Sequence, residues 1–465
     1  MLRLFKQYYP IRNLFFVIGE GLIIYLSVLL ACWAILDGST DLLDPGLSAK
    51  ALLITFICQT FLYYYDLYDL NVTKTFLELG IRLLQALGSS SIFLAIIYFF
   101  LPLMIIEKGI FIISVCFIVI FITAWRYGYL IVLNREMFNQ KIILLGSGEL
   151  AQNITAEINA KRDSGYKIAA TVTEHHDAAC FEDISSGRTI CKENYKDLCE
   201  IAQNLKIKKI IVALKEKRKA FPTEELLKCR VNGIEILEGN SFYEMLTGKL
   251  IVEQTNPAWL IFSDGFHKPF TKRFFKRSTD ILFSLILLII TLPVIIVIAI
   301  LIKIDSKGPA IFSQERVGMN KKIYRVHKFR SMIADAEQHS GPVWAKKDDD
   351  RITRIGKFIR RCRIDEIPQL WNVLKGDMSF VGPRPEREFF VEKLEKIIPY
   401  YRERFTVKPG LTGWAQINYG YGATVEDAIE KLNYDLFYIK NMSILMDLMV
   451  VLRTVKTVFF SKGAH

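Results

Sequence analysis

Long apolar segments constrain this chain more than any other feature of its sequence. Hydrophobic residues make up 51% of the chain, and they gather in blocks instead of spreading evenly. Several of the blocks in the first third approach or exceed the roughly 20 apolar residues that a helix needs to cross a bilayer. They are residues 14–36, 51–65, 83–106 and 109–133. We therefore predict a membrane protein in which residues 1–137 form an N-terminal bundle of four transmembrane helices.

Basic residues in the loops predict how this bundle is oriented. They lie before the first segment, between the second and third, and after the fourth, at Arg3, Lys6, Arg12, Lys74, Arg82, Arg135 and Lys141. Because cytoplasmic loops are enriched in Lys and Arg, both ends of the bundle should face the cytoplasm. The first segment is too long for a signal peptide and no small-residue cleavage site follows it, so we expect it to remain as an anchor. Glu20, inside this segment, should face other helices and be structural.

The stretch KIILLGSGELAQNITAEI, residues 141–158, has the pattern of a strand, a tight turn and a helix. Further strand candidates are residues 167–172, 208–214 and 234–237. Alternating strands and helices predict a Rossmann-like α/β domain with a parallel sheet over residues 138–252. The glycine pattern GSGELA alone is a weak signal for a dinucleotide, and Glu174 lies late for a ribose-binding acid. We therefore expect a structural or regulatory domain without a bound cofactor.

A linker, residues 253–271, leads to a fifth apolar segment at residues 281–302. Basic residues flank this segment on both sides, at Lys272, Arg273, Lys276, Arg277, Lys303 and Lys307. Positive charge at both ends argues against ordinary crossing. Pro293, near the middle, removes one helical hydrogen bond and favours a break. We predict a re-entrant helix over about residues 278–303 that enters and leaves on the cytoplasmic side, although a spanning helix remains the alternative.

Two adjacent carboxylates, Asp365 and Glu366, occur in the stretch RIDEIPQLWNVLKGDMSFVGPRPE. Apolar spacing over residues 367–375 predicts a short helix that ends at Gly376. Asp365 would then lie at or near the N-cap, where the helix dipole favours an ionised carboxylate and a bound phosphate. Such a carboxylate is a good nucleophile toward phosphorus. The alternative is that Asp365 only caps the helix.

Fixed cations elsewhere in the last third strengthen the chemical interpretation. Lys328 and Arg330 are two residues apart in an extended run, so both should point to one face, and Arg384 stands between two prolines. Several cations near two acids suit a diphosphate and Mg²⁺. The net charge of +12 fits anionic lipid or phosphorylated substrates. The chain contains neither a Walker A motif nor the loop set of a kinase, so ATP is not indicated.

Residues 272–465 resemble the bacterial sugar transferase family, the monotopic polyprenyl-phosphate phosphoglycosyl transferases. The matching stretches are FSQERVGMNKKIYRVHKFRSMIADAE, RRCRIDEIPQLWNVLKGDMSFVGPRPE and VKPGLTGWAQINYGYG. Membrane helices, a Rossmann-like domain and then an α-rich monotopic catalytic domain look like the large members of that family. Those members start exopolysaccharide or O-antigen repeat units, and this chain looks closest to the exopolysaccharide branch.

The resemblance implies a reaction and a set of residues. A UDP-sugar would donate sugar-1-phosphate to polyprenyl (undecaprenyl) phosphate, with release of UMP, through a phosphosugar-aspartyl intermediate on Asp365. Glu366, with Asp365, would hold Mg²⁺. Lys328, Arg360 and Arg384 would bind phosphates, with Arg330 and Arg363 as helpers. It also implies a homodimer in the bacterial inner membrane, with the Rossmann-like and catalytic domains on the cytoplasmic side. The sugar, and any role of Gln416 and Asp435, stay unassigned.

Two other functions compete with this interpretation. A membrane-bound sugar-nucleotide dehydratase also joins transmembrane helices to a Rossmann domain, but it would need a nicotinamide cofactor and a Tyr-x-x-x-Lys pair on a helix. The spacing occurs at Tyr324 and Lys328, in an extended run. A non-catalytic scaffold of a polysaccharide synthase would leave the acids and cations unexplained. Nucleic-acid binding is not expected, because the basic residues flank membrane segments.

Overall fold

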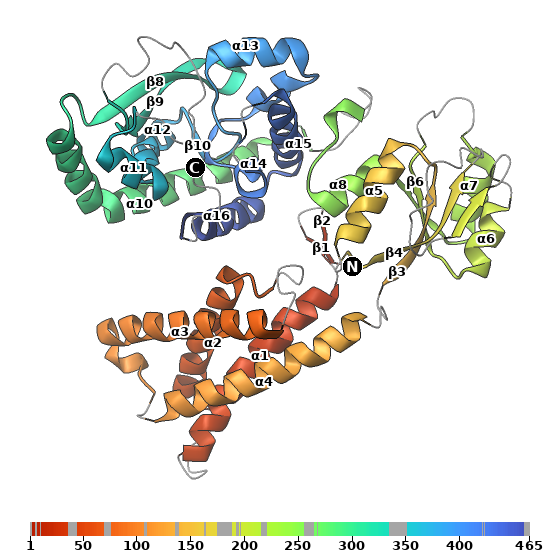
Figure 1. Cartoon of the computed structure of the whole chain (residues 1–465), viewed down its shortest axis with the longest axis horizontal. Helices are drawn as coiled ribbons and strands as arrows, with labels where there is room; N and C mark the ends of the chain where they lie inside the picture. The colour runs from red at the N-terminus through yellow and green to blue at the C-terminus, as the bar shows by residue number, and fades with distance from the viewer. Residues whose placement is uncertain are drawn as a thin grey trace. The chain divides into compact units, whose positions relative to one another are not determined.

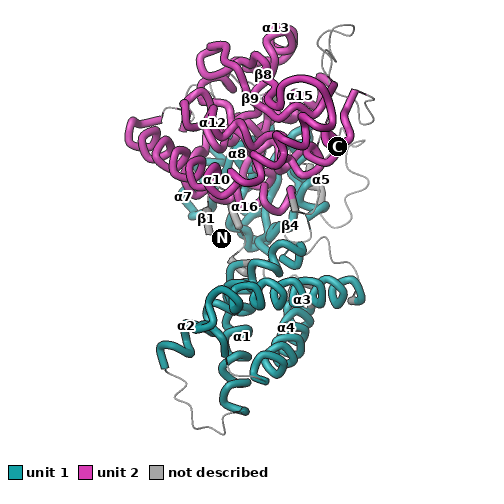
Figure 2. The backbone as a smooth tube through the Cα atoms, turned by 90° about the vertical axis from the view of Figure 1, so that its left-hand side faces the viewer, with its two compact units in different colours: residues 1–4, 8–242 teal, residues 5–7, 243–465 magenta. Residues whose placement is uncertain are grey.

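The computed structural model, whose elements are labelled in Figure 1, divides into the two compact units that Figure 2 distinguishes by colour. The first unit contains residues 1–4 and 8–242, and the second contains residues 5–7 and 243–465. The predicted division into four parts is finer than this and stays a prediction. The structure describes residues 2–4, 7–9, 11–35, 44–68, 76–106, 109–134, 139–161, 164–173, 188–191, 195, 197–214, 221–254, 265–266, 268–333, 351–420, 422 and 424–459.

Apolar helices begin the first unit, after two short strands, β1 (Leu2–Leu4) and β2 (Gln7–Tyr9). They are α1 (Ile11–Ile35), α2 (Pro45–Tyr64), α3 (Phe76–Phe100) and α4 (Ile110–Asn134), with a 3₁₀ turn, η1 (Pro102–Met104), between the last two. All four contribute to one apolar core, and each is long and apolar enough to cross a membrane. Many leucine and isoleucine side chains on their outer faces are exposed, as lipid-facing side chains would be.

Glu20 and Arg126 form an ion pair inside the core of these helices. Arg126 Nε lies 2.8 Å and Arg126 Nη2 lies 2.7 Å from Glu20 Oε1. The Arg126 side chain is 3% exposed and the Glu20 side chain 0%. Arg126 Nη1 also donates to the carbonyl oxygen of Leu67 at 2.6 Å. The guanidinium lies over the rings of Phe16 and Tyr68. This confirms that Glu20 faces neighbouring helices, where a paired charge stabilises one arrangement of α1 and α4.

A five-stranded parallel sheet follows the apolar helices. Its strands are β3 (Gln140–Leu145), β4 (Tyr166–Thr173), β5 (Arg188–Cys191), β6 (Lys209–Val212) and β7 (Glu235–Glu238), in the order β5-β4-β3-β6-β7. The helices α5 (Glu149–Ala160), α6 (Leu198–Asn204), α7 (Thr223–Val231) and α8 (Gly239–Thr247) alternate with the strands. The parallel α/β prediction is confirmed, although β5 was not among the predicted strands.

The turn after β3 has the geometry that its glycines suggested. Gly146 has a φ of +115°, and a Cβ atom there would lie 2.7 Å from the carbonyl oxygen of Ala213. Only glycine fits such a left-handed position against a neighbouring backbone. Gly148 is the N-cap of α5, as the strand–turn–helix pattern predicted. Glu174 lies outside the described residues.

The second unit is rich in helices, with two small sheets. Its elements are η4 (Val252–Gln254), α10 (Phe270–Asp305), β8 (Ile311–Val317), η5 (Met319–Lys321), β9 (Ile323–Phe329), α11 (Arg354–Arg361), η6 (Ile364–Glu366), α12 (Gln369–Lys375), β10 (Ser379–Val381), α13 (Glu388–Ile397), η7 (Tyr401–Thr406), β11 (Gly410–Thr412), α14 (Trp414–Asn418), α15 (Val425–Asn441) and α16 (Ile444–Phe459). β8 and β9 form an antiparallel pair, and β10 and β11 a parallel pair. One large apolar core joins α12 to α16 and holds the loops between them in place.

α10 runs as one helix through Pro293. The predicted break into two separate helices is therefore wrong, although the path of α10 in the membrane stays a prediction. A proline removes one helical hydrogen bond but does not have to end the helix. The Thr291 hydroxyl donates to the carbonyl oxygen of Leu287 at 2.6 Å, a back-bond that commonly accompanies a bend. Sequence reasoning overestimated what one proline does inside a long apolar run.

Both ends of α10 contact the rest of the second unit. Near its start, Arg277 donates to the carbonyl oxygens of Val373 and Leu374 at 2.6 and 2.7 Å. Near its end, Ile298 and Ile302 are buried in a small cluster with residues of β9 and α11. Large apolar side chains between these two anchors are exposed, at Ile289, Ile290, Leu292, Val294, Ile296 and Val297. The helix therefore presents an apolar middle and two anchored ends.

Candidate active site

Asp365 and Glu366 lie in η6, the 3₁₀ turn between α11 and α12. The N-cap of α12 is Pro368, so the prediction that Asp365 caps this helix is wrong. Arg363 has a φ of +55°, and the chain tightens into a 3₁₀ turn directly after it. Ile367 and Pro368 have right-handed helical φ and ψ, so Asp365 lies in the turn that leads into α12 and not at its N-cap. Gly376, with a φ of +100°, ends the helix as predicted.

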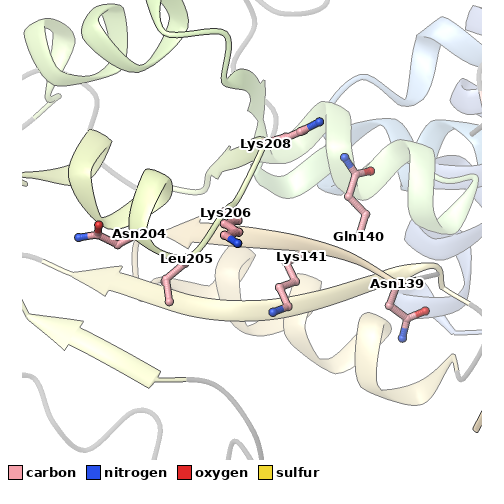
Figure 3. A pocket seen from close by; sticks show the side chains of 7 residues that line it. All are labelled: Asn139, Gln140, Lys141, Asn204, Leu205, Lys206 and Lys208. Atoms are coloured by element: carbon pink, nitrogen blue, oxygen red, sulfur yellow. The ribbon is translucent and has the colours of Figure 1, made fainter. Parts of the chain in front are cut away.

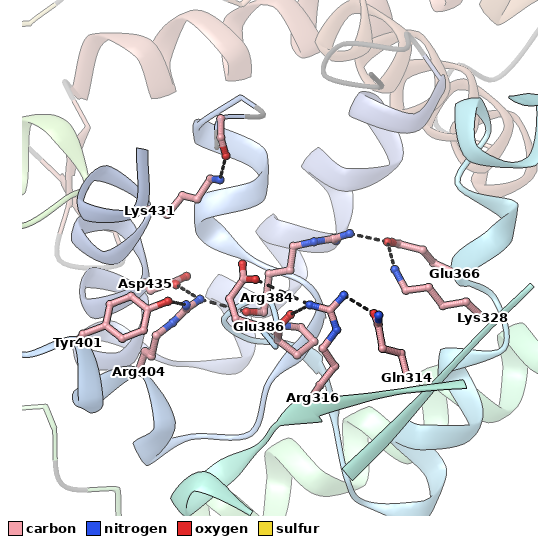
Figure 4. Close-up of polar contacts among 12 residues, drawn as sticks. Gln314, Arg316, Lys328, Glu366, Arg384, Glu386, Tyr401, Arg404, Lys431 and Asp435 are labelled. Atoms are coloured by element: carbon pink, nitrogen blue, oxygen red, sulfur yellow. Dashed lines mark hydrogen bonds and ion pairs between the residues drawn. The ribbon is translucent and has the colours of Figure 1, made fainter. Parts of the chain in front are cut away.

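Two cations hold the carboxylate of Glu366 (Figure 4). Lys328 Nζ lies 3.2 Å from Glu366 Oε1, and Arg384 Nη2 lies 2.8 Å from the same oxygen. Lys328 comes from β9 and Arg384 from the loop after β10, so three separate parts of the chain meet here. The exposed fraction is 12% for the Glu366 side chain, 24% for Lys328 and 43% for Arg384. The cluster is buried on the acid side and open on the arginine side.

The two carboxylates differ in electrostatic state. Burial, with the neighbouring Glu366 charge, raises the pKa of Asp365 from 3.8 to about 6, against the opposing effect of nearby cations. Burial would also raise the pKa of Glu366, but Arg384 and Lys328 hold that pKa well below its usual value. Glu366 therefore stays ionised, whereas Asp365 is a more basic carboxylate that is still mostly ionised at neutral pH. Such a divergence between adjacent acids is typical of functional sites.

The other predicted cations take different places. Arg360, in the last turn of α11, lowers the pKa of Asp365, and Arg363 lowers that of Glu366, so both act on the acid pair. Arg330 follows β9 and its Nη2 atom donates to the carbonyl oxygen of Ser306, at the end of α10, at 2.7 Å. The structure does not bring Arg330 to Glu366, and its role in phosphate binding stays a prediction. Pro293 lies within α10.

A second charged network contacts the backbone of Arg384. Arg404 in η7 donates from Nη2 to Asp435 Oδ2 at 2.9 Å and from Nη1 to the Tyr401 hydroxyl at 2.6 Å. It also donates to the carbonyl oxygen of Arg384 at 3.0 Å. Sequence reasoning named Asp435 without a role and missed Arg404. The spacing of Tyr401 and Arg404, three residues apart and so on one face of a helical turn, was the available signal.

The donors available for a metal are the two adjacent carboxylates. Among the residues that the structure describes, no group of three or more His, Cys, Asp or Glu side chains could hold a metal ion. Mg²⁺ often takes only one or two carboxylates and completes its shell with water and substrate phosphates. Asp365, whose pKa is raised by burial and by the Glu366 charge, is a carboxylate that a divalent cation would stabilise. The donor set therefore fits Mg²⁺ when a diphosphate is also present.

A separate basic pocket lies in the α/β part of the first unit (Figure 3). Its volume is about 510 Å³, and it is lined by Asn139, Gln140, Lys141, Asn204, Leu205, Lys206 and Lys208. The lining contains no carboxylate or thiol, and it lies at the amino ends of the parallel strands β3 and β6. Ligands of open parallel sheets usually bind at the opposite, carboxyl edge. We therefore place the candidate chemistry at Asp365 and Glu366.

Two family models match parts of this chain. A model described as "Bacterial sugar transferase" matches residues 271–461, which contain every residue of the candidate active site. A model described as "CoA-binding domain" matches residues 64–237, which include the strands β3 to β7 up to the third residue of β7. The geometry of Asp365, Glu366, Lys328 and Arg384 thus lies within a region that matches a transferase family.

Several relatives of known name match part of this chain. An Aeromonas hydrophila protein named UDP-N-acetylgalactosamine-undecaprenyl-phosphate N-acetylgalactosaminephosphotransferase is 41% identical over 240 residues, 52% of this chain and 56% of the relative. A Klebsiella pneumoniae protein named UDP-glucose:undecaprenyl-phosphate glucose-1-phosphate transferase is 45% identical over 193 residues, 41% of each chain. The chain thus spans about half the length of these relatives.

One further relative is matched over nearly its whole length. The Rhizobium leguminosarum exopolysaccharide production protein PSS is 43% identical over 185 residues, which are 39% of this chain and 92% of that protein. A match of this extent, together with the family model over the site, shows which family this is. The chain belongs to the bacterial sugar transferase family.

Proposed function

We propose that this protein transfers sugar-1-phosphate from a UDP-sugar to undecaprenyl phosphate and releases UMP, the first step of building a polysaccharide repeat unit. The observation that carries the proposal is the acid pair. Asp365 is a half-buried carboxylate beside an ionised Glu366 that Lys328 and Arg384 hold in place. The names of the relatives, which state UDP-sugars and undecaprenyl phosphate, support the same substrates here.

The reaction proceeds in two displacements. An Asp365 carboxylate oxygen attacks the β-phosphorus of the UDP-sugar, and the bond from that phosphorus to the bridging oxygen breaks. UMP leaves with the electron pair, and an acyl phosphate joins Asp365 to the sugar-1-phosphate. A phosphate oxygen of undecaprenyl phosphate then attacks the same phosphorus. The Asp365 carboxylate is released, and the product is a polyprenyl diphosphate sugar.

The cations prepare this site for a diphosphate. Lys328 and Arg384 neutralise Glu366, while Arg360 acts on Asp365 itself and favours its ionised form. The exposed side of Arg384 is available for a substrate phosphate as well. Asp365 and Glu366, with oxygens of the substrate, would hold Mg²⁺, which supplies positive charge opposite the transferring phosphoryl group. Removal of the metal with EDTA should therefore stop turnover, and Mg²⁺ should restore it.

A direct test measures UMP from the purified full chain in nanodiscs. With a panel of UDP-sugars, undecaprenyl phosphate and Mg²⁺, at least one sugar should give multiple turnovers. Without lipid acceptor, the same sugar should give a burst of about one UMP per protein, and the peptide containing Asp365 should gain the mass of the sugar phosphate. Steady UMP release that depends on lipid, with no burst and no modified peptide, would rule out the two-step route.

We also propose that α10 is re-entrant in the bacterial inner membrane, with both units' soluble parts in the cytoplasm. A helix that crosses a bilayer has its ends on opposite sides, yet both ends of α10 contact one soluble unit. Exposed Leu445, Leu448 and Leu452 on α16 support contact of this unit with a membrane surface. Lys272→Cys and Lys307→Cys, each made in a chain whose native cysteines have been replaced, test on which side of the membrane the two ends of α10 lie. Labelling from the cytoplasmic side only is expected at both positions, and labelling from opposite sides would exclude a re-entrant helix.

The dehydratase alternative has less support. Tyr324 and Lys328 both lie on β9, so their Cα atoms are about 13 Å apart, at about 3.3 Å per residue. A Tyr-x-x-x-Lys pair acts from neighbouring turns of a helix, where the same spacing is about 6 Å.

A homodimer, which the family resemblance implied, is part of the proposal as well. Mass photometry in nanodiscs should give twice the chain mass.

A further inference from the structure

The loop that carries Arg384 is hydrogen-bonded through its backbone at every residue from 382 to 386. Gly382 donates through its amide, and the carbonyl oxygens of the next four residues accept, at distances between 2.9 and 3.3 Å. The partners, in loop order, are Thr412, Gly410, Arg404, Arg316 and Val317. Pro383 and Pro385 have no amide hydrogen to donate and have a nearly fixed φ. The loop is therefore held more completely than its prolines alone would achieve.

Two of these five partners are arginine side chains, and one of them is buried. Arg404 is 7% exposed, and Asp435, its ion-pair partner, is 2% exposed. The guanidinium is fixed by two groups, the Asp435 carboxylate at 2.9 Å and the Tyr401 hydroxyl at 2.6 Å. Its third bond goes to the carbonyl oxygen of Arg384 at 3.0 Å (Figure 4). A planar fork held in this way sets the position of its remaining partner closely.

This contact acts on the residue whose side chain reaches Glu366. The Arg384 side chain is 43% exposed, so its own packing does little to fix it. Its reach to Glu366, at 2.8 Å, depends on where the loop holds its backbone. A misplacement of about 1 Å at a reacting site can reduce the rate about 100-fold. A buried ion pair that touches the Arg384 backbone can therefore affect the chemistry from a distance.

We propose that Arg404 is a positioning residue, which Asp435 and Tyr401 hold so that it fixes the backbone of Arg384 and thereby the contact of Arg384 with Glu366. The inference rests on the proposed function, in which Arg384 serves a diphosphate. It gives Asp435 a role without any contact with substrate. The rival explanation is that Arg404 and Asp435 only stabilise the fold, as many buried ion pairs do.

The test separates positioning from stability with three variants of the full chain. Arg404→Lys keeps the charge but loses the planar fork. The double variant Arg404→Met/Asp435→Leu replaces the pair with apolar side chains, which is often neutral or stabilising for a buried ion pair. Tyr401→Phe removes one acceptor and little volume. Glu244→Gln is the matched control, because Glu244 is a buried acid that accepts from Lys440 and Asn441, and none of its described hydrogen bonds goes to residues 382–386.

The first two variants should lower kcat/KM for UMP release by about 10- to 100-fold, and Tyr401→Phe by less. Hydrogen–deuterium exchange should speed up at the amides of Gly410 and Val317, whose acceptors are in the loop. Glu244→Gln should lower the melting temperature without either change. If the double variant has the melting temperature and the turnover of the wild type, Arg404 is only structural and the inference is overturned.

The exchange measurement also keeps the two proposals distinguishable. If the wild-type chain releases no UMP from any UDP-sugar, the proposed function fails, but faster exchange in Arg404→Lys would still show that Arg404 holds the loop. If the wild type turns over and Arg404→Lys shows unchanged kcat/KM and unchanged exchange at Gly410 and Val317, positioning by Arg404 is excluded while the proposed function stands.

Discussion

Glu20 and Glu366 are both buried acids that accept from an arginine, yet their surroundings differ. Glu20 has one cation, Arg126, and that side chain is 3% exposed among apolar and aromatic neighbours. Glu366 has two cations, and one of them, Arg384, is 43% exposed. A second acid, Asp365, lies next to Glu366 and has a raised pKa. The Glu20 site is closed to solvent and has one negative and one positive charge. The Glu366 site is open to solvent at Arg384 and contains a second carboxylate, that of Asp365.

The difference suggests how to read buried charges in one chain. In a closed pair such as Glu20 and Arg126 the two charges face each other, so the pair specifies which helices pack together. The Glu366 cluster holds one acid ionised so that its neighbour and an exposed arginine remain available. Burial alone does not separate the two, since both acids are buried. The separation comes from the neighbouring acid and from the exposure of the cation.

The largest effect expected is that of Asp365→Asn. The amide cannot attack phosphorus, so UMP release should fall by roughly 10⁴-fold or more. Glu20→Gln is the matched change in the closed pair and should leave turnover per folded molecule unchanged. UMP release from nanodiscs, with circular dichroism to check folding, measures both. Near-normal turnover of a folded Asp365→Asn protein would remove the main difference between the two acids.

Glu366→Gln should have the next largest effect. The neutral amide no longer pairs with the charges of Lys328 and Arg384, so these side chains lose the contact that positions them. We expect kcat to fall about 10²- to 10³-fold. Glu315→Gln is a suitable control. Glu315 is an exposed residue of β8 that pairs with Arg325, so the substitution should not change turnover. If Glu366→Gln lowered only the melting temperature, Glu366 would belong with Glu20 as a structural acid.

The sequence allowed the parts that depend on local pattern to be predicted. The apolar segments became α1 to α4, and the strand–turn–helix pattern became β3 and α5. Lys328 was chosen from its place in an extended run and Arg384 from the prolines on either side of it, and the two side chains do meet at Glu366. These features follow from hydrophobic runs, glycines and prolines, whose physical effects act over a few residues.

The parts that depend on tertiary contacts could not be predicted from the sequence. Asp365 is not the cap of α12, because the helix begins after Pro368, and a 3₁₀ turn with a left-handed φ at Arg363 comes before it. Arg330 turns to the end of α10 instead of toward Glu366, since its guanidinium bonds Ser306. Arg404 lies in the highly charged run YRERF, and only the fold buries it against Asp435. A charged residue's burial depends on what packs over it, which the sequence alone does not state.

A stability comparison is the third test of the contrast. Arg126→Met leaves Glu20 buried without its cation and should cost about 3–5 kcal/mol of unfolding free energy. Arg384→Met removes a side chain that is 43% exposed and should cost only about 0–1 kcal/mol, while it lowers turnover. Thermal melts in nanodiscs and UMP release, measured on both variants, should therefore rank them in opposite orders. Equal ranking by both measurements would contradict the contrast.

The pH dependence gives the smallest effect and the finest comparison. The pKa of Asp365 is raised to about 6, and the reaction needs its ionised form. At low Mg²⁺, turnover should therefore fall about tenfold for each pH unit below 6, and Mg²⁺ bound at Asp365 should move this fall to lower pH. The Glu20→Gln variant should keep this profile, because Glu20 takes no part in the reaction. A profile with no inflection near pH 6 at low Mg²⁺, and no shift as Mg²⁺ is raised, would mean that Asp365 is not the titrating nucleophile.

The same shift has a consequence for stability with a defined sign. In the folded protein Asp365 binds its proton more tightly than in the unfolded chain, where its pKa is near 3.8. Its ionisation therefore lowers stability as the pH rises from about 4 through about 6, and the loss is complete above that range. Asp365→Asn has no such loss, so its melting temperature should exceed that of the wild type at pH 7 by more than at pH 4. A protein that becomes inactive and more stable through one substitution would place Asp365 among residues kept for chemistry, unlike Glu20, whose loss should only destabilise.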